Sequence, residues 1–227
     1  MQMSEKELIV SSHERLVDWV QSGLHAGRFA PGQKLVETSL MKALGISRGP
    51  VREGLKRLQG KGIVVIEQNR GASIRAYTRK GAANFLRVIE PLTRLMAQMA
   101  AEAVANGASS QDLVEMREWF TRLGNGELQA SSFYDRRNHF YNVLMNLGGN
   151  EELKQIMPLE ALHLLRLQTF PYLSQSDKND IVNEYLDITI AVLNGNPDSA
   201  SQAAFKHIQA AKHRQNNIAS IAFQFDE

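Results

Sequence analysis

The stretch that decides the fold spans residues 31–71 and reads PGQKLVETSLMKALGISRGPVREGLKRLQGKGIVVIEQNRG. A tight turn at Pro31–Gly32 precedes a predicted helix over residues 36–44. Ser47 is placed to cap a second helix with its side-chain oxygen. Pro50 lies in the first turn of that helix, where a missing N–H breaks no helical bond. Two short helices joined by a glycine-containing turn are typical of a helix-turn-helix, whose second helix enters the DNA major groove.

The second helix is predicted to have an apolar face and a basic face. Its apolar residues recur at the i, i+4, i+7 spacing of a helix packed on a core, and they are Val51, Leu55 and Leu58. The basic strip beside them follows the i, i+4, i+8 spacing and contains Arg48, Arg52 and Lys56. A guanidinium group matches guanine O6/N7 or a phosphate with two parallel hydrogen bonds. A basic helix face is often merely solvated, but the preceding turn and the strands that follow favour DNA contact here.

A β-hairpin is predicted directly after the second helix. The β-branched run at residues 63–66 and the strand at residues 72–76 flank a turn that contains Asn69, Arg70 and Gly71. A hairpin in this position is a wing. At its tip, Arg70 is placed to enter the minor groove, and Gly71 lets the backbone approach phosphate closely.

From about Leu16 to Tyr77 the chain resembles the winged helix-turn-helix of the GntR family of bacterial transcription regulators. The matching residues are Pro31-Gly32, Leu35, Glu37, Leu40, Leu44-Gly45, Ser47-Arg48, Pro50-Val51-Arg52-Glu53, Leu55, Leu58, Gly62 and Asn69-Arg70-Gly71. The resemblance implies that Arg48 and Arg52 contact bases or adjacent phosphates, that Thr38 contacts a phosphate, and that Gly71 meets the minor-groove edge.

Two glycines depart from the family pattern inside the second helix. Gly49 stands where the family usually has Thr, and Gly54 stands where it usually has Ala. Each glycine is expected to cost roughly 1 kcal/mol of helix stability relative to alanine. The isolated helix is therefore expected to be weak.

Charge is divided unevenly along the 227 residues. Residues 1–80 carry 14 Lys and Arg against 7 Asp and Glu, whereas residues 81–227 carry 12 against 17. A basic head on an acidic body is expected when only one part approaches nucleic acid. The chain has no cysteine, so disulfides and thiolate metal sites are excluded. No apolar run approaches the roughly 20 residues that span a bilayer, so we expect a cytoplasmic protein without a membrane partner.

The predicted fold class is mainly α, with a winged helix-turn-helix over residues 1–78 and an all-α antiparallel bundle over residues 79–227. Pro91 is expected to bend the first bundle helix. A capping box from Ser109 to Asp112 is expected to start the second. The remaining bundle helices are expected over residues 132–147, from Asn150 to Pro171, from Ser176 or Asp177 to Asn194, and over residues 198–221.

One constellation in the bundle has possible metal chemistry. Asp135 and His139 are four residues apart and share a helix face, and His207 lies on the last helix. A carboxylate and imidazoles from separate helices can hold Zn²⁺, Mn²⁺ or Ni²⁺. An Asp/His pair at this spacing is more often a surface hydrogen bond, and the residues alone leave both interpretations open.

Residues 85–210 resemble the FCD ligand-binding domain of the FadR subgroup of GntR regulators. The matching pieces are Arg87-Val-Ile-Glu90, Ala100-Ala101-Glu102, Asp135-Arg-Arg-Asn-His139-Phe140, Gly149-Asn150, Glu184 and His207-Ile208. The family commonly binds metal through an Asp and three His, and Tyr185 stands at the position of one expected His. The resemblance leaves a three-ligand site of Asp135, His139 and His207 open.

The same resemblance implies a pocket for a small effector, often an organic acid. Arg87 is the first candidate partner of its carboxylate, followed by Arg166 and His163, and Tyr185 is expected to point into the cavity. The sequence therefore predicts a homodimeric repressor that binds a pseudo-palindromic double-stranded operator and responds to a small molecule. Two alternatives stay open: a metal-dependent enzyme with a DNA-binding appendage, and an acyl-CoA-sensing regulator without metal.

Overall fold

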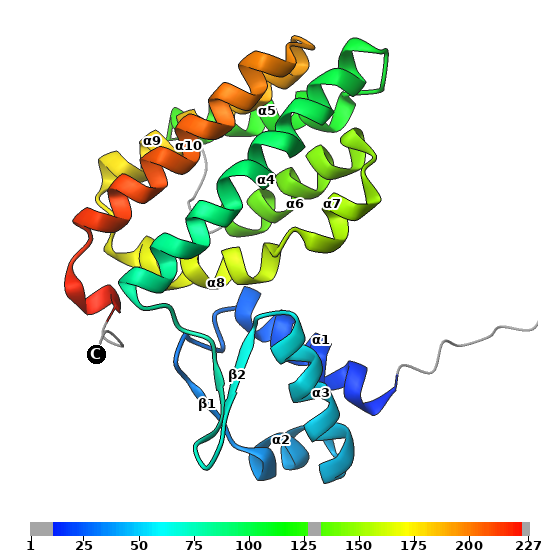
Figure 1. Ribbon diagram of the computed structural model, residues 1–227, viewed down its shortest axis with the longest axis vertical. Coiled ribbons are helices and arrows are strands. Elements are labelled where there is room, and N and C mark those ends of the chain that lie inside the picture. The colour runs from blue at the N-terminus through cyan, green and yellow to red at the C-terminus, as the bar shows by residue number, and fades with distance from the viewer. Residues whose placement is uncertain (1–10, 127–132, 224–227) are drawn as a thin grey trace, which may run out of the picture. The chain divides into compact units, whose positions relative to one another are not determined.

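A computed structural model describes residues 11–126 and 133–223 and divides the chain into two compact units, Met1–Ala76 and Tyr77–Glu227 (Figure 1). The described part of the first unit, residues 11–76, combines three helices with a small sheet. Its elements are α1 (Ser12–His25), β1 (Lys34–Leu35), α2 (Glu37–Leu44), α3 (Arg48–Gly60), β2 (Val64–Glu67) and β3 (Gly71–Ile74).

The sheet of the first unit is antiparallel, with strand order β1-β3-β2. Strands β2 and β3 form the predicted hairpin, in which Val64 pairs with Ile74 and Glu67 pairs with Gly71. Asn69 and Gly71 have φ angles of 65° and 82°, the left-handed backbone that a tight hairpin turn requires. The two-residue strand β1, which pairs with β3, was not predicted from the sequence.

Helix α3 packs on α1, as its apolar face predicted. Val51, Leu55 and Leu58 are buried, and Gly54 lies against α1 as well. A Cβ atom at Gly54 would stand 2.4 Å from Leu16 Cδ2 and 3.1 Å from the His13 carbonyl oxygen. Gly54 is therefore a packing requirement, and the prediction that it merely weakens the helix was incomplete.

The cap of α3 differs from the prediction. Ser47 occupies the N-cap position, but its side chain makes no capping hydrogen bond. Counting from Arg48 as the first helical residue, Pro50 occupies the third position, whose N–H an N-cap oxygen normally accepts. Because proline has no N–H, that capping bond cannot form.

The regular elements in the described part of the second unit, residues 77–126 and 133–223, are all helices. Its α-helices are α4 (Arg79–Ala105), α5 (Gln111–Gly124), α6 (Phe133–Gly148), α7 (Glu151–Ile156), α8 (Leu159–Thr169), α9 (Gln175–Leu193) and α10 (Pro197–Asn217). The long helices α4 and α10 run side by side, and α4 also packs on α6 and α9 (Figure 1). A ring cluster of Phe120, Phe140, Tyr141 and Tyr185 lies in the core of this unit.

Three helix starts in the second unit differ from the sequence prediction. Helix α5 begins after Ser110, which makes no side-chain cap, so the box predicted from Ser109 is absent. Helix α9 begins after Ser174, whose hydroxyl and Asp177 form a capping box. The helix predicted from Asn150 to Pro171 is split into α7 and α8, because the residue before Pro158 is pushed out of the helical region.

Tyr77 and Thr78, which were expected to end the first domain, belong to the helical unit. The Tyr77 N–H donates to Gln168 Oε1 at 2.8 Å, and Gln168 Nε2 donates to the Tyr77 carbonyl at 2.7 Å. Thr78 caps α4 by accepting from the Gly81 N–H at 2.9 Å. The side chain of Gln168 thus fixes the first residue of the helical unit through two backbone bonds.

Candidate functional sites

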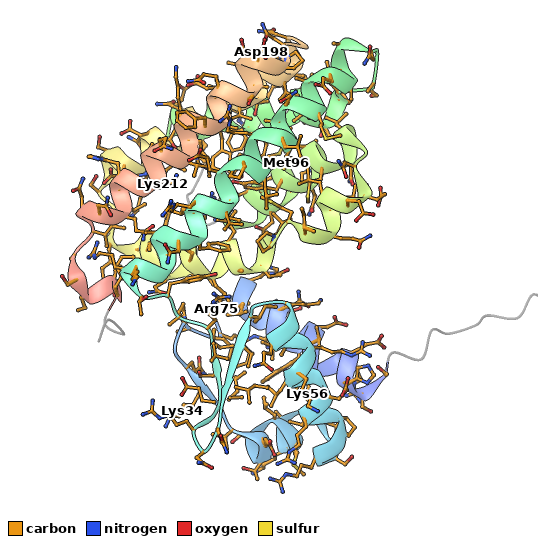
Figure 2. All side chains as sticks on the ribbon, viewed as in Figure 1. Lys34, Lys56, Arg75, Met96, Asp198 and Lys212 are labelled. Carbon is orange, nitrogen blue, oxygen red and sulfur yellow. The ribbon has the colours of Figure 1, made fainter. Side chains whose placement is uncertain are left out.

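The exposed side of α3 carries the predicted basic strip. Arg48, Arg52 and Lys56 are all exposed, while the opposite side of the helix is buried. Lys34 and Lys56 both lie on the surface of this unit (Figure 2). The helix is therefore anchored by one face and presents cations on the other, the geometry of a recognition helix.

Glu37 on α2 organises two of these cations. Its carboxylate accepts from Arg48 Nε at 2.8 Å and from Arg52 Nε at 3.1 Å. The hydrogen bond from Arg48, followed by that from Arg52, holds the pKa of Glu37 below its usual value. Both guanidinium groups are thus held beside each other by one carboxylate, and their terminal nitrogens remain available for an anion such as phosphate.

An open groove of about 570 Å³ lies between α2, the start of α3 and the wing. Four predicted DNA-contact residues line it, namely Thr38, Arg48, Arg70 and Gly71. Arg70 at the wing tip has 81% of its side chain exposed and lies 3.8 Å from Glu67. The structure thus brings the predicted helix and wing contacts onto one surface.

Lys34 on β1 lines the same groove and was missed in the sequence analysis. The sequence gives little indication of this strand, because β1 has only two residues, with Lys34 exposed and Leu35 buried. The short strand nevertheless adds a positive charge to the groove. Lys34 joins the candidate phosphate contacts.

A small cavity of about 60 Å³ lies inside the helical unit. This is several times the roughly 10–15 Å³ that one water molecule needs. Much of its wall is apolar, and the apolar residues include Leu86, Leu162, Leu165, Ile181, Ile208, Ala211 and Ile218. Its polar wall includes Arg137, Arg166, His207, Arg214 and Gln215. An apolar pocket with a few convergent polar groups is the usual form of a small-molecule site.

Arg166 on α8 is the centre of the polar wall. Its guanidinium donates to the hydroxyls of Tyr185 and Tyr141, the second at 3.2 Å, and lies 3.3 Å from His207 Nε2. Burial acts to lower the pKa of Arg166, but the neighbouring phenols outweigh it, and the pKa lies above its ordinary value. Arg166 is therefore a permanent positive charge whose partners among the described side chains are neutral.

His207 on α10 is buried and connects Arg166 to an ion pair. Its Nδ1 lies 2.8 Å from Glu184 Oε2, and Arg214 binds both Glu184 oxygens at 2.7 Å. Burial lowers the pKa of His207, although its hydrogen bond to Glu184 acts in the opposite direction. A neutral His207 donates from Nδ1 to Glu184 and accepts at Nε2 from Arg166.

Burial would raise the pKa of Glu184, but the hydrogen bonds from His207 and Arg214 outweigh it, so the pKa lies below its usual value. Glu184 is thus ionised and held from two sides. It fixes the ring of His207, which in turn faces Arg166.

Gln215 ties the cavity to the start of α4. Its Nε2 donates to the Arg79 carbonyl at 2.9 Å, and this bond sets the orientation of the amide. Only 4% of Gln215 is exposed, and its Oε1 has no hydrogen-bond partner among the described residues. A buried acceptor in a cavity wall, left unpaired, is a group that a bound ligand can satisfy.

The other predicted effector residues fall in different places. His163 is buried, with Nδ1 3.3 Å from Arg137 Nη2, behind the cavity wall. Arg87 is exposed, while its neighbour Leu86 lines the cavity. The prediction of Arg87 as first carboxylate partner is not supported, because one residue along a helix turns the side chain by about 100°.

Comparison with known proteins decides the family. Residues 13–74 match the family described as bacterial regulatory proteins, gntR family, and residues 89–210 match the FCD domain. The chain belongs to the gntR family of bacterial regulatory proteins. It is a transcription regulator with an FCD domain, as the sequence predicted.

Individual relatives agree with this assignment. The chain is 26% identical over 187 residues to the uncharacterised HTH-type transcriptional regulator YdhC of Bacillus subtilis (strain 168), covering 80% of each chain. It is 22% identical over 182 residues to the HTH-type transcriptional repressor RspR of Escherichia coli (strain K12), covering 79% of this chain and 78% of RspR. A putative transcriptional regulator GntR from Rhodococcus sp. RHA1 shares the fold, with a TM-score of 0.74 at 18% identity, covering 90% of this chain and 97% of that one.

The metal site implied by the FCD domain does not fit the described side chains of this regulator. Among the side chains that the structure describes, in residues 11–126 and 136–223, no three from His, Cys, Asp or Glu form a group that could hold a metal ion. His139 is exposed on α6, whereas His207 is buried and faces Arg166. Asp135 lies in α6, but its side chain is outside the described part of the structure. Among the described side chains, His139 and His207 therefore belong to no group of three that could hold a metal.

In the same described ranges, no helix combines the length and apolar character that crossing a membrane requires.

Proposed function

We propose that this regulator is a homodimeric, ligand-controlled repressor that reads DNA with α3 and the wing and binds a small organic acid in the helical unit. The groove that gathers Thr38, Arg48, Arg70 and Gly71 on one surface carries the DNA-binding part of this proposal. Arg52 and Lys56 extend the same charge along α3. RspR, a relative, is named a repressor, which supports that direction of control.

Dimerisation follows from the size of one winged unit. A single recognition helix and wing make too few contacts for the roughly 10⁻⁸ to 10⁻¹¹ M affinity of specific operators. Two copies related by a two-fold axis would read two half-sites of a pseudo-palindrome. The operator is therefore expected to contain two inverted half-sites.

Ligand control is supported by the bonds between the cavity region and residues 77–79. Gln215 lines the cavity and holds the Arg79 carbonyl, and Gln168, two residues after Arg166, holds both backbone groups of Tyr77. Tyr77 is covalently joined to the last residue of the winged unit. A ligand that shifts α8 or α10 therefore acts on the segment that carries the DNA-binding unit. Coupling of this kind requires the ligand to bind one arrangement better than the other.

The two alternatives from the sequence have less support. The enzyme hypothesis used Asp135, His139 and His207 around a metal-bound water, but no group of three metal ligands is found among the described side chains. The relatives are named transcriptional regulators. An acyl-CoA would need far more room than a cavity of about 60 Å³ offers.

Selection of tight binders from random double-stranded DNA, followed by footprinting with the full-length protein, tests the proposal. We expect two protected half-sites in inverted orientation, and sedimentation of the complex is expected to show two copies per operator. Gel shifts with a panel of small organic acids then test whether a ligand controls DNA binding. At least one acid is expected to weaken operator binding. A single protected half-site bound by one copy, or no response to any acid, would contradict the corresponding part of the proposal.

A further inference from the structure

The residues at the metal site that the FCD domain implies do not suit a metal ion, and the contacts of one arginine give the reason. Tyr185 stands at the position of one expected histidine, and its hydroxyl accepts a hydrogen bond from Arg166. The last histidine of the motif, His207, directs Nε2 toward the same guanidinium at 3.3 Å. Arg166 thus contacts both the tyrosine that stands in place of an expected histidine and the histidine that the chain retains.

We propose that the Arg166 guanidinium takes the place of the metal ion in this regulator and receives the carboxylate of a small acid directly. This inference rests on the proposed function, because it concerns the same effector cavity. A divalent cation beside the fixed charge of Arg166 would be repelled, and the Nε2 lone pair that it needs already accepts from the guanidinium. Arg166 therefore keeps a positive charge in the cavity while excluding a divalent metal ion.

The surroundings of Arg166 suit an incoming anion. Its partners among the described side chains are two phenol hydroxyls and a neutral imidazole, none of which cancels its charge. The nearby carboxylate of Glu184 is already bound by both terminal nitrogens of Arg214. A ligand carboxylate would supply the negative charge that Arg166 lacks among these partners, through a charge-assisted hydrogen bond.

The rest of the wall narrows the class of acid. The aliphatic side chains from α4, α8, α9 and α10 accept a short apolar body, and the volume of about 60 Å³ limits its length. Gln215 Oε1, a buried acceptor without a partner among the described residues, requires a donor. A ligand hydroxyl would provide one. The best-matched ligand is thus a short hydroxycarboxylic acid, and a plain short carboxylic acid matches less well.

Thermal unfolding of the full-length, EDTA-dialysed protein tests whether a ligand binds through the negative charge of its carboxylate. We expect 3-hydroxybutyrate to raise the melting temperature more than butyrate, and the neutral amides of both acids to have no effect, because only a carboxylate pairs with Arg166. Arg166→Gln is expected to weaken binding of both acids by roughly tenfold or more, as loss of a charge-assisted hydrogen bond predicts. Arg166→Lys, which keeps the charge and loses the planar guanidinium with its several donors, is expected to bind with intermediate affinity. Arg117→Gln changes an exposed arginine of the same unit and serves as the matched control.

Calorimetric titration with Zn²⁺ and Ni²⁺ tests the exclusion of metal. Wild type and His207→Asn are expected to give the same weak heats, because His207 is not a ligand. A saturable site that disappears in His207→Asn would overturn the inference, and so would stabilisation by the acids that appears only after Zn²⁺ is added. Equal stabilisation of wild type and Arg166→Gln, or by acid and amide alike, would also overturn it. If operator binding responds to an acid only with metal present, the proposed function stands and this inference fails.

Discussion

Arginine occupies opposite environments in the two units of this regulator. In the winged unit, Arg48 and Arg52 are largely exposed and share a carboxylate, Glu37, at the protein surface. In the helical unit, Arg214 has 9% of its side chain exposed and grips Glu184 with both terminal nitrogens, while Arg166 contacts neutral oxygens and an imidazole. Exposed guanidinium groups suit a polyanion met from solvent, whereas an enclosed one suits a single small anion.

The largest expected difference concerns the two kinds of ion pair within the helical unit itself. Glu184→Ala leaves Arg214 mostly buried without its carboxylate and is expected to lower the free energy of unfolding by about 3 kcal/mol. Glu151→Ala removes an equally short pair, 2.7 Å from Lys154, but Glu151 is 73% exposed, so the loss is expected to stay under about 1 kcal/mol. Urea denaturation of both variants measures the contrast. Equal losses would show that burial does not set the strength of these pairs.

The next largest effect is a loss of operator affinity when the basic residues of α3 are replaced. Arg52→Ala is expected to cost about 1–3 kcal/mol of operator affinity and to relax base preference at one position per half-site. Lys56→Ala should instead weaken binding to all sequences and flatten its dependence on salt, because lysine acts as a point charge toward phosphate. Gel-shift titrations at several salt concentrations separate the two. Unchanged affinity and preference in Arg52→Ala would contradict the assignment of α3 as the recognition helix.

A smaller effect compares two glycines of α3. A methyl group added at Gly49 would meet no heavy atom within 4 Å, so Gly49→Ala is expected to stabilise the protein by up to about 1 kcal/mol through helix propensity. Gly54→Ala would gain the same propensity but push against Leu16 and the His13 carbonyl, and it is expected to destabilise. Thermal unfolding of the two variants shows whether each substitution raises or lowers the melting temperature. Stabilisation by both would show that α1 can move away from α3 at little cost.

The smallest effect is a pH dependence from His207. Its pKa is lowered in the folded state by burial, so the unfolded chain binds more protons and stability is lost as the pH falls from about 6.5 through the folded pKa. The charged groups around it are Arg166 on α8, Glu184 on α9 and Arg214 on α10. His207→Asn cannot take up this proton, so its melting temperature is expected to fall less than that of wild type between pH 7 and pH 5. Parallel pH profiles would show that His207 is not held neutral.

Local sequence patterns were enough to predict most of the winged unit. The residues 37–74 that form α2, α3 and the wing are contiguous, so turn glycines, the i, i+4 spacing and β-branched runs each report on neighbours in the chain. Helix α1 and the two-residue strand β1 were not identified from the sequence, and the side-chain cap predicted for Ser47 is absent. The basic face of α3 followed from the sequence because an amphipathic helix fixes which side turns outward.

The sequence by itself determined the two-part organisation, the family and the exposed basic face of α3, whereas only the tertiary structure decided which side chains of the helical unit share the cavity. Its wall joins residues from Leu86 to Ile218 across several helices. On α6 the structure turns Arg137 inward and leaves His139, two positions later, exposed. A step of two residues rotates a side chain by about 200° around a helix, so spacing along the chain cannot fix which residue faces a distant helix until the helices are packed.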